Sequence, residues 1–238
     1  LFILADDLGY VDVGVYGGKE VATPNVDRLA AEGMRFDHFY TNGATCTPTR
    51  ISLLTGRYPQ RFGFREGLRS ASSRGVSGGA RTWPQLLKGA GYETMHVGKW
   101  NVGHAQEEFR PLAKGYDGFF GFLHAWFLPQ TYRRPMLQRD EGPAELHPGH
   151  LSDLLTDETI AFLRSRRATD PPFFLSLWTF SPHVPFQPPR RWSREFDATM
   201  AGRYAALVSA LDENLGRVLD ALAEADLAED TIVIFASD

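Results

Sequence analysis

The apolar positions of this 238-residue chain fall into short continuous runs, separated by segments of helical spacing. Such runs are typical of strands that are buried on both faces of a sheet. They predict strands at residues 1–5, 35–41, 93–99, 173–180 and 231–237. The alternation of strands with helices predicts an α/β fold, with a mostly parallel central sheet flanked by helices.

Helix signals occur between these runs, at residues 23–33, 48–56, 82–91, 151–166 and 202–225. In the first segment Thr23 can cap the helix, Pro24 suits the first turn and Gly33 can stop it. The last segment keeps apolar residues three and four apart, as a helix that covers a sheet does. Residues 69–81 form a Ser/Gly/Arg loop, and residues 124–150 form an irregular stretch rich in Pro, His and Arg. We see no repeat and no linker, so we expect residues 1–238 to form one domain.

Composition narrows the choice of partners. The net charge of −4 and the isoelectric point near 6.0 leave no overall basic footprint for nucleic acid. A single cysteine excludes an internal disulfide, and no run of 18 apolar residues is present to span a membrane. The chain opens without methionine on LFILADD and closes on TIVIFASD. We therefore expect a fragment that is truncated at both ends.

The only cysteine lies in the segment ATCTPTR, residues 44–50. Pro48 suits a first helical position and Thr47 can cap it, so this pattern predicts that Cys46 lies just outside a helix N-terminus. Unpaired N–H groups there attract anions, and Arg50 adds a fixed positive charge. Cys46 is therefore either a small buried apolar residue or a reactive thiol beside an oxyanion site.

Polar residues end several of the expected strands. The first ends in Asp6 and Asp7, the third in Lys99, the fourth runs into a loop with His183, and the last ends in Asp238. In an open parallel sheet the ligand site lies beyond the carboxyl ends of the strands, so these side chains can meet at one edge.

Adjacent carboxylates repel each other and are costly to desolvate, so Asp6 and Asp7 require a compensating cation. Ca²⁺, or less favourably Mg²⁺, fits oxygen ligands, with Asp238 as a third carboxylate. Alternatively, one aspartate caps a turn while the other is solvated. Lys99 can likewise be an ordinary residue at a strand end, and His183 a loop histidine stacked against prolines.

Six ordered blocks that cover nearly the whole chain resemble the type I sulfatases of the alkaline phosphatase superfamily. They are LFILADDLGY, TPNVDRLAAEGMRFDHFYT, CTPTRISLLTGRYPQR, GYETMHVGKW with GYDGFFGF, SPHVPFQPP, and the final segment from YAALVSAL to TIVIFASD. The third block is similar to the signature that directs oxidation of its cysteine to formylglycine.

The resemblance implies an alkaline phosphatase-like fold and a sulfuric ester hydrolase. A formylglycine-generating enzyme would convert Cys46 to an aldehyde, whose hydrate attacks the sulfur of a sulfate ester, of a small molecule or a glycan, and expels the alcohol. The resemblance also implies export to the periplasm or the extracellular space. The implied catalytic residues are Cys46, Arg50, Lys99 and His183, and the implied metal ligands are Asp6, Asp7, Asp238 and the modified Cys46.

This chain departs from the family pattern in two ways. The family usually has Lys-Trp-His where this chain has Lys99, Trp100 and Asn101, and an asparagine cannot titrate near neutral pH. The next histidine along the chain after Asn101 is His104. The family also continues past the final aspartate with further site residues and a C-terminal subdomain. The alternatives are a phosphonate or phosphate monoester hydrolase of the same superfamily and a silent homologue that binds sulfated glycans.

The irregular stretch also contains candidate substrate contacts. Its arginines can meet a polyanionic glycan or be solvated, and its aromatic residues can stack on a sugar or pack against the sheet. These residues are Arg133, Arg134 and Arg139, with Trp126, Phe127 and Tyr132.

Overall fold

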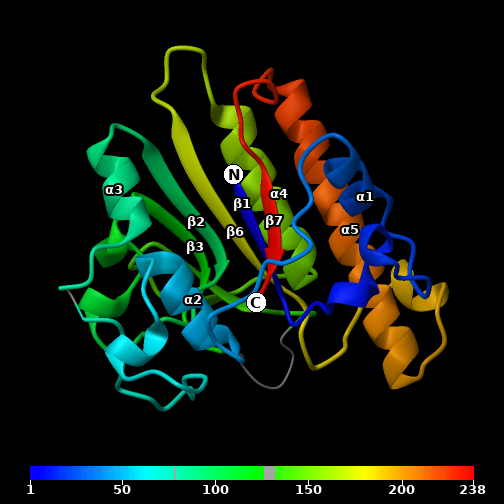
Figure 1. The fold of residues 1–238 in the computed structure, drawn as a ribbon, viewed down its shortest axis with the longest axis horizontal. Coiled ribbons are helices and arrows are strands. Elements are labelled where there is room, and N and C mark those ends of the chain that lie inside the picture. The colour runs from blue at the N-terminus through cyan, green and yellow to red at the C-terminus, as the bar shows by residue number, and fades with distance from the viewer. Residues whose placement is uncertain (78, 126–131) are drawn as a thin grey trace.

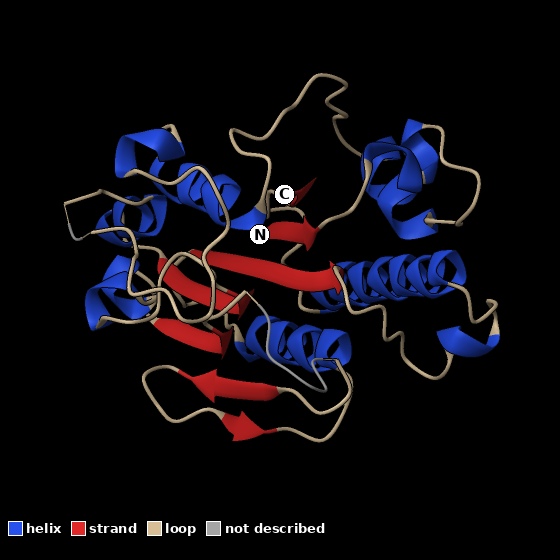
Figure 2. Ribbon diagram, turned by 90° about the horizontal axis from the view of Figure 1, so that it is seen from below, coloured by secondary structure: helices blue, strands red, loops and turns tan. Residues whose placement is uncertain are grey.

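The computed structural model describes residues 1–77, 79–125 and 132–238, and it contains a seven-stranded sheet between two layers of helices (Figures 1 and 2). The strand order is β5-β4-β3-β2-β6-β1-β7. Five neighbouring strands, β3, β2, β6, β1 and β7, are parallel, whereas β4 and β5 add an antiparallel edge. The expected α/β fold with a mostly parallel sheet is therefore confirmed.

The strands are β1 (Phe2–Asp6), β2 (Glu93–Lys99), β3 (Gly118–Phe122), β4 (Met136–Arg139), β5 (Glu145–Leu146), β6 (Phe173–Pro182) and β7 (Ile234–Ser237). In the central pairs, Phe2 lies opposite Ser176 of β6 and Ile234 of β7. His96 of β2 lies opposite Ser176 on the other side of β6. This register aligns the carboxyl ends of β1, β2, β6 and β7.

The helices are α1 (Pro24–Ala31), α2 (Cys46–Thr55), α3 (Trp83–Gly89), α4 (Leu151–Ser165) and α5 (Met200–Glu224). Short 3₁₀ helices lie at Tyr10–Asp12, Gly14–Tyr16, Pro59–Phe62, Glu107–Phe109, Leu112–Lys114 and Trp192–Arg194. None of the helices in the described ranges is long and apolar enough to cross a bilayer.

Two hydrophobic clusters follow from the alternation of side chains along the buried strands. Ile3 and Ala5 join the cluster that holds α1, α4 and α5 to one face of the sheet. Phe2 and Leu4 join the cluster that holds α2 and α3 to the other face. Every residue of β1 is buried, which is why the strand reads as a continuous apolar run.

Most of the expected elements are present, but residues 35–41 do not form a strand. Their apolar side chains are exposed, Phe39 to 70% and Tyr40 to 77%, and no described strand lies beside them. A strand needs a neighbour for its backbone hydrogen bonds, so local composition alone was misleading here.

The sequence pattern also missed β3, β4 and β5. Residues 124–150 are thus not wholly irregular, because β4 and β5 lie within them. Both strands are short, which gives hydrophobic alternation little length over which to show.

Candidate active site

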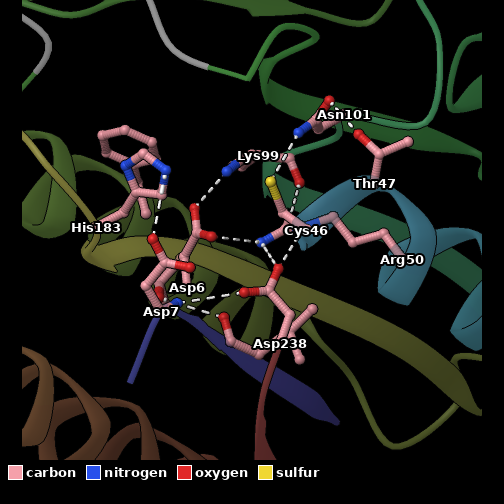
Figure 3. A network of polar contacts seen from close by, with 12 residues as sticks. Asp6, Asp7, Cys46, Thr47, Arg50, Lys99, Asn101, His183 and Asp238 are labelled. Carbon is pink, nitrogen blue, oxygen red and sulfur yellow. Dashed lines mark hydrogen bonds and ion pairs between the residues drawn. The ribbon is translucent and has the colours of Figure 1, made fainter. Parts of the chain in front are cut away.

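Polar side chains from four parallel strands and from α2 meet at the carboxyl edge of the sheet (Figure 3). Asp6 ends β1, Lys99 ends β2, His183 follows β6 and Asp238 follows β7. Asp7 follows Asp6 in a left-handed backbone conformation with φ of 63°. The structure therefore brings together the residues that the strand-end argument selected.

Cys46 is the first residue of α2, and the helix begins two residues earlier than expected. Thr45 is the N-cap residue, and its carbonyl accepts the Thr49 N–H at 3.2 Å. The prediction that Thr47 caps the helix and leaves Cys46 outside it was wrong, because Pro48 is tolerated anywhere in the first turn, where its missing N–H needs no partner. Gly56 ends the helix as expected, with φ of 64°.

The Cys46 side chain is half-buried and is held by one side-chain hydrogen bond. The Asn101 amide nitrogen donates to its sulfur at 3.2 Å. The amide oxygen of Asn101 accepts from the Thr47 hydroxyl at 2.9 Å, and that hydroxyl accepts from the Leu68 N–H at 2.8 Å. This chain of donors fixes the amide orientation, so Asn101 presents N–H rather than oxygen to residue 46.

Arg50 lies one turn along α2 and is completely buried. Its Nε and Nη2 contact the Asp238 carboxylate at 2.8 and 2.7 Å, and its Nη1 donates to the Lys99 carbonyl oxygen at 2.7 Å. The guanidinium carbon lies 5.2 Å from the centre of the Trp178 ring. Burial alone would lower the pKa of Arg50, but the carboxylates of Asp238 and Asp6 outweigh it and raise the pKa.

Lys99 and Asp6 form a second buried ion pair, with 2.6 Å between Nζ and Oδ2. Asp6 Oδ1 lies 3.6 Å from Arg50 Nη2 and has no hydrogen-bond partner, although it is fully buried. The pKa of Asp238 is raised, mainly by burial and also by the charge of Asp6, although the charge of Arg50 acts to lower it. Two cations and two carboxylates therefore neutralise one another beneath the surface.

Asp7 and His183 form the outer part of the cluster. The His183 Nε2 atom lies 3.5 Å from Asp7 Oδ2, and its Nδ1 hydrogen-bonds the Val184 carbonyl oxygen. The ring stacks on Phe180 with 4.7 Å between centres. Because a carbonyl oxygen only accepts, Nδ1 carries the proton and Nε2 faces the carboxylate. The Asp7 N–H points inward and donates to Asp238 Oδ1 at 3.3 Å.

The donor set fits a hard divalent cation. Asp6, Asp7 and His183 each offer a ligand atom within 4.8 Å of the others. The buried Oδ1 of Asp6 accepts no hydrogen bond from the described residues, which leaves an oxygen ligand for a cation. Asp238 is linked to this group through the Asp7 N–H, while Cys46 contacts Asn101 instead.

Two of the six candidate substrate contacts from the irregular stretch, Arg139 and Tyr132, contact other parts of the protein. Arg139 forms a bidentate pair with Glu158 at 2.8 and 2.7 Å. Tyr132 is buried and donates to the Phe180 and His183 carbonyl oxygens, so it packs under the site and supports the His183 loop. Arg133 and Arg134 form no ion pair among the described residues. Trp126 and Phe127 lie outside the described residues.

Sequence reasoning missed two residues and left a third unplaced. Thr47, expected only as a helix cap, anchors Asn101, and Trp178 lies under the Arg50 guanidinium; neither contact is marked in the local sequence. His104 does not replace the missing family histidine, since its ring bonds the Ser70 carbonyl oxygen at 3.0 Å. Burial lowers the pKa of His104, more than its hydrogen bond to Ser70 raises it.

The sequence and the fold both match known proteins. The model of the sulfatase family matches residues 1–238. N-acetylgalactosamine-6-sulfatase from Sus scrofa is 36% identical over 260 residues, which cover 100% of this chain and 49% of that protein. Arylsulfatase A from Homo sapiens is 33% identical and is covered to 51%. The chain thus spans about half the length of the curated relatives it matches.

The fold also agrees with that of a solved structure. The crystal structure of Ps i-CgsB in complex with k-i-k-neocarrahexaose superposes with a TM-score of 0.91 at 30% identity, over 99% of this chain and 57% of that one. The relatives from pig and human are named as sulfatases, which are hydrolases of sulfuric esters. On this agreement of sequence and fold, the chain belongs to the sulfatase family.

Proposed function

We propose that the full-length protein hydrolyses a sulfate monoester with a formylglycine residue made from Cys46. One observation carries the proposal. Cys46 begins α2, one turn from the buried Arg50, and the Asn101 amide reaches its side chain. A residue placed in this way meets the cation, the helix N-terminus and the amide donor that an oxyanion requires. The formylglycine hydrate supplies two hydroxyls on one carbon, one to attack sulfur and one to release it.

A divalent cation completes the site in this proposal, with Ca²⁺ favoured over Mg²⁺ because the donors are carboxylate oxygens. Asp6, Asp7, Asp238 and the modified Cys46 would hold it. When bound, the cation supplies positive charge that lowers the pKa of a nucleophilic hydroxyl and polarises the ester. The two-point contact of Arg50 with Asp238 fixes that carboxylate in place.

Lys99 and His183 take the remaining roles in the proposal. Lys99 Nζ lies at the carboxyl edge beside Asp6, where it can donate to a sulfate oxygen without leaving its partner. His183 keeps its Nδ1 proton on the Val184 carbonyl, so Nε2 is the atom that exchanges a proton with the leaving oxygen. An acid of this kind contributes a rate factor of about 10² to 10⁴.

Asn101 limits what the site can do and favours a second candidate. Its amide donates to residue 46 but accepts no proton near neutral pH, so proton removal from the hydrate depends on other groups. A silent homologue that binds sulfated glycans without cleaving them is therefore the second candidate. A phosphonate or phosphate monoester hydrolase of the same superfamily is a further alternative, which the assay below distinguishes.

The substrate class proposed is a sulfated small molecule or glycan. The relatives are named N-acetylgalactosamine-6-sulfatase and arylsulfatase A, and a similar structure is a complex with k-i-k-neocarrahexaose. A formylglycine-generating enzyme would act on the protein during maturation, and export to the periplasm or the extracellular space is proposed with it.

The proposal is tested by measuring sulfate release from para-nitrophenyl sulfate by the full-length protein loaded with Ca²⁺. We expect turnover, and its loss in Cys46→Ala. Release of phosphate from para-nitrophenyl phosphate at a higher kcat/KM would support the phosphoesterase instead. Binding of a sulfated glycan without turnover, in protein shown to contain formylglycine and metal, would support the silent homologue.

A further inference from the structure

The segment that follows α2 is strongly basic in a chain that is acidic overall. Residues 57–81 contain six arginines and a single acidic residue, Glu66, whereas the whole chain has a net charge of −4. None of the six arginines forms an ion pair with a carboxylate in the part of the chain that the structure describes. Their charges are therefore available to an external anion.

Residues 63–74 of this segment form a loop that is held in place from inside. Phe64 is buried to 2% exposure, and the Arg74 guanidinium lies over its ring at 4.5 Å. Arg74 also donates to the Gly63 carbonyl oxygen, which closes the loop on itself. The His104 ring bonds the Ser70 carbonyl oxygen at 3.0 Å, which ties the loop to the segment after β2. The loop therefore has a defined shape before any ligand arrives.

Two arginines of the loop have fixed backbones and free side chains. Arg65 follows the buried Phe64, and Arg69 follows Leu68, which is buried to 7% exposure. Both arginines are exposed and line a pocket of about 430 Å³, together with Arg74. The other lining residues are the acidic Glu66, Leu68 and four small residues, which leave room for a ligand.

The pocket adjoins the candidate active site. The Leu68 N–H, between the two arginines, donates to the hydroxyl of Thr47, the neighbour of Cys46. A side-chain carbon added at Gly67 would lie 3.9 Å from the hydroxyl of Thr45, the other neighbour of Cys46. An oligosaccharide with one sulfate at residue 46 thus has this loop directly beside it.

We propose that Arg65 and Arg69 form an anion subsite, which binds a second sulfate group on a sulfated oligosaccharide whose first sulfate lies at Cys46. The inference rests on the proposed function and deepens it, since it assigns multiply sulfated glycans as the substrate class. Guanidinium groups suit this role because their planar donors match sulfate oxygens in pairs. The neighbouring pocket accepts the sugar that carries the second sulfate.

The test is direct binding of a fluorescent dextran sulfate oligosaccharide to full-length protein at about 0.15 M ionic strength. We expect the double variant Arg65→Gln/Arg69→Gln to bind it about tenfold more weakly than the wild type, given exposed charge contacts of ordinary strength. Its kcat/KM for para-nitrophenyl sulfate, which carries one sulfate and no glycan, should stay within about twofold of the wild type.

The matched control is Arg167→Gln/Arg194→Gln, which removes two exposed arginines that have no ion pair among the described residues. Arg167 lies before the amino end of β6, at the opposite edge of the sheet. Equal weakening in this control would overturn the subsite, because it would show an effect of net charge alone. Unchanged binding in the loop variant, or equal competition by a single-stranded oligonucleotide of matched charge, would overturn it too. A wild type inactive on para-nitrophenyl sulfate contradicts the proposed function, while the binding result still decides the subsite.

Discussion

Replacing Lys99 by methionine removes one charge from the buried cluster while keeping the length of the side chain. The ammonium lies 2.6 Å from Asp6 Oδ2, and both side chains have no exposed area. At this distance the attraction is about 6 kcal/mol for an effective dielectric constant of about 20, before desolvation is subtracted. Breaking a buried pair from one side costs about 3–5 kcal/mol, because the partner charge stays buried. We expect Lys99→Met to lower the free energy of unfolding by about 3–5 kcal/mol.

The measurement is urea denaturation of full-length protein at neutral pH in the presence of a chelator. Adding Asp6→Asn to Lys99→Met should recover part of the loss, with a coupling energy of about 2 kcal/mol or more. With Ca²⁺ in place of the chelator, the loss in Lys99→Met should be smaller, because a bound cation would compensate Asp6.

The control is Lys88→Met, which breaks the exposed pair between Lys88 and Asp117. We expect it to cost at most about 1 kcal/mol. If Lys99→Met costs no more than this control, or if the two cluster substitutions are additive, the buried charges do not compensate one another and the reasoning is refuted.

Three further outcomes follow from the structure. Gly98→Ala should destabilise the protein by about 2–4 kcal/mol in urea, because Gly98 has φ of 112° and the new carbon would lie 1.9 Å from the Trp178 carbonyl oxygen; wild-type stability would contradict this. Burial alone would raise the pKa of Asp153, but the hydrogen bonds and the charge of Arg191 lower it. The pair therefore stabilises the protein at pH values above the ordinary aspartate pKa of about 3.9. This stability is lost as the pH falls through the lower pKa that Asp153 has in the folded protein. The urea midpoints of Asp153→Asn and wild type should therefore differ at neutral pH and converge in acid. Chelation should destabilise wild type by about 3 kcal/mol relative to Ca²⁺ at about 100 times its Kd, and Asp7→Asn by much less; equal shifts would exclude Asp7 from the metal site.

The position of the candidate site could be predicted because it depends on topology rather than on detail. Parallel strands end at a common edge, so Asp6, Lys99 and Asp238 had to lie close together once β1, β2 and β7 were recognised. The apolar runs of these strands are long enough to identify them without any knowledge of their neighbours.

Other features depend on contacts that a single segment does not encode. Residues 35–41 have the composition of a strand but have no described strand to pair with. The amide orientation of Asn101 is set by Thr47, which is 54 residues away. The sequence does not show that the loop of residues 63–74 lies beside Cys46, because this depends on the hydrogen bond between Leu68 and Thr47.

The most direct test of the central claim is peptide mass spectrometry of the full-length protein from its native host. The account predicts that the peptide containing Cys46 is about 18 Da lighter than its unmodified form, as expected for conversion of the thiol to an aldehyde. An intact thiol in a host that modifies its other sulfatases would contradict the account.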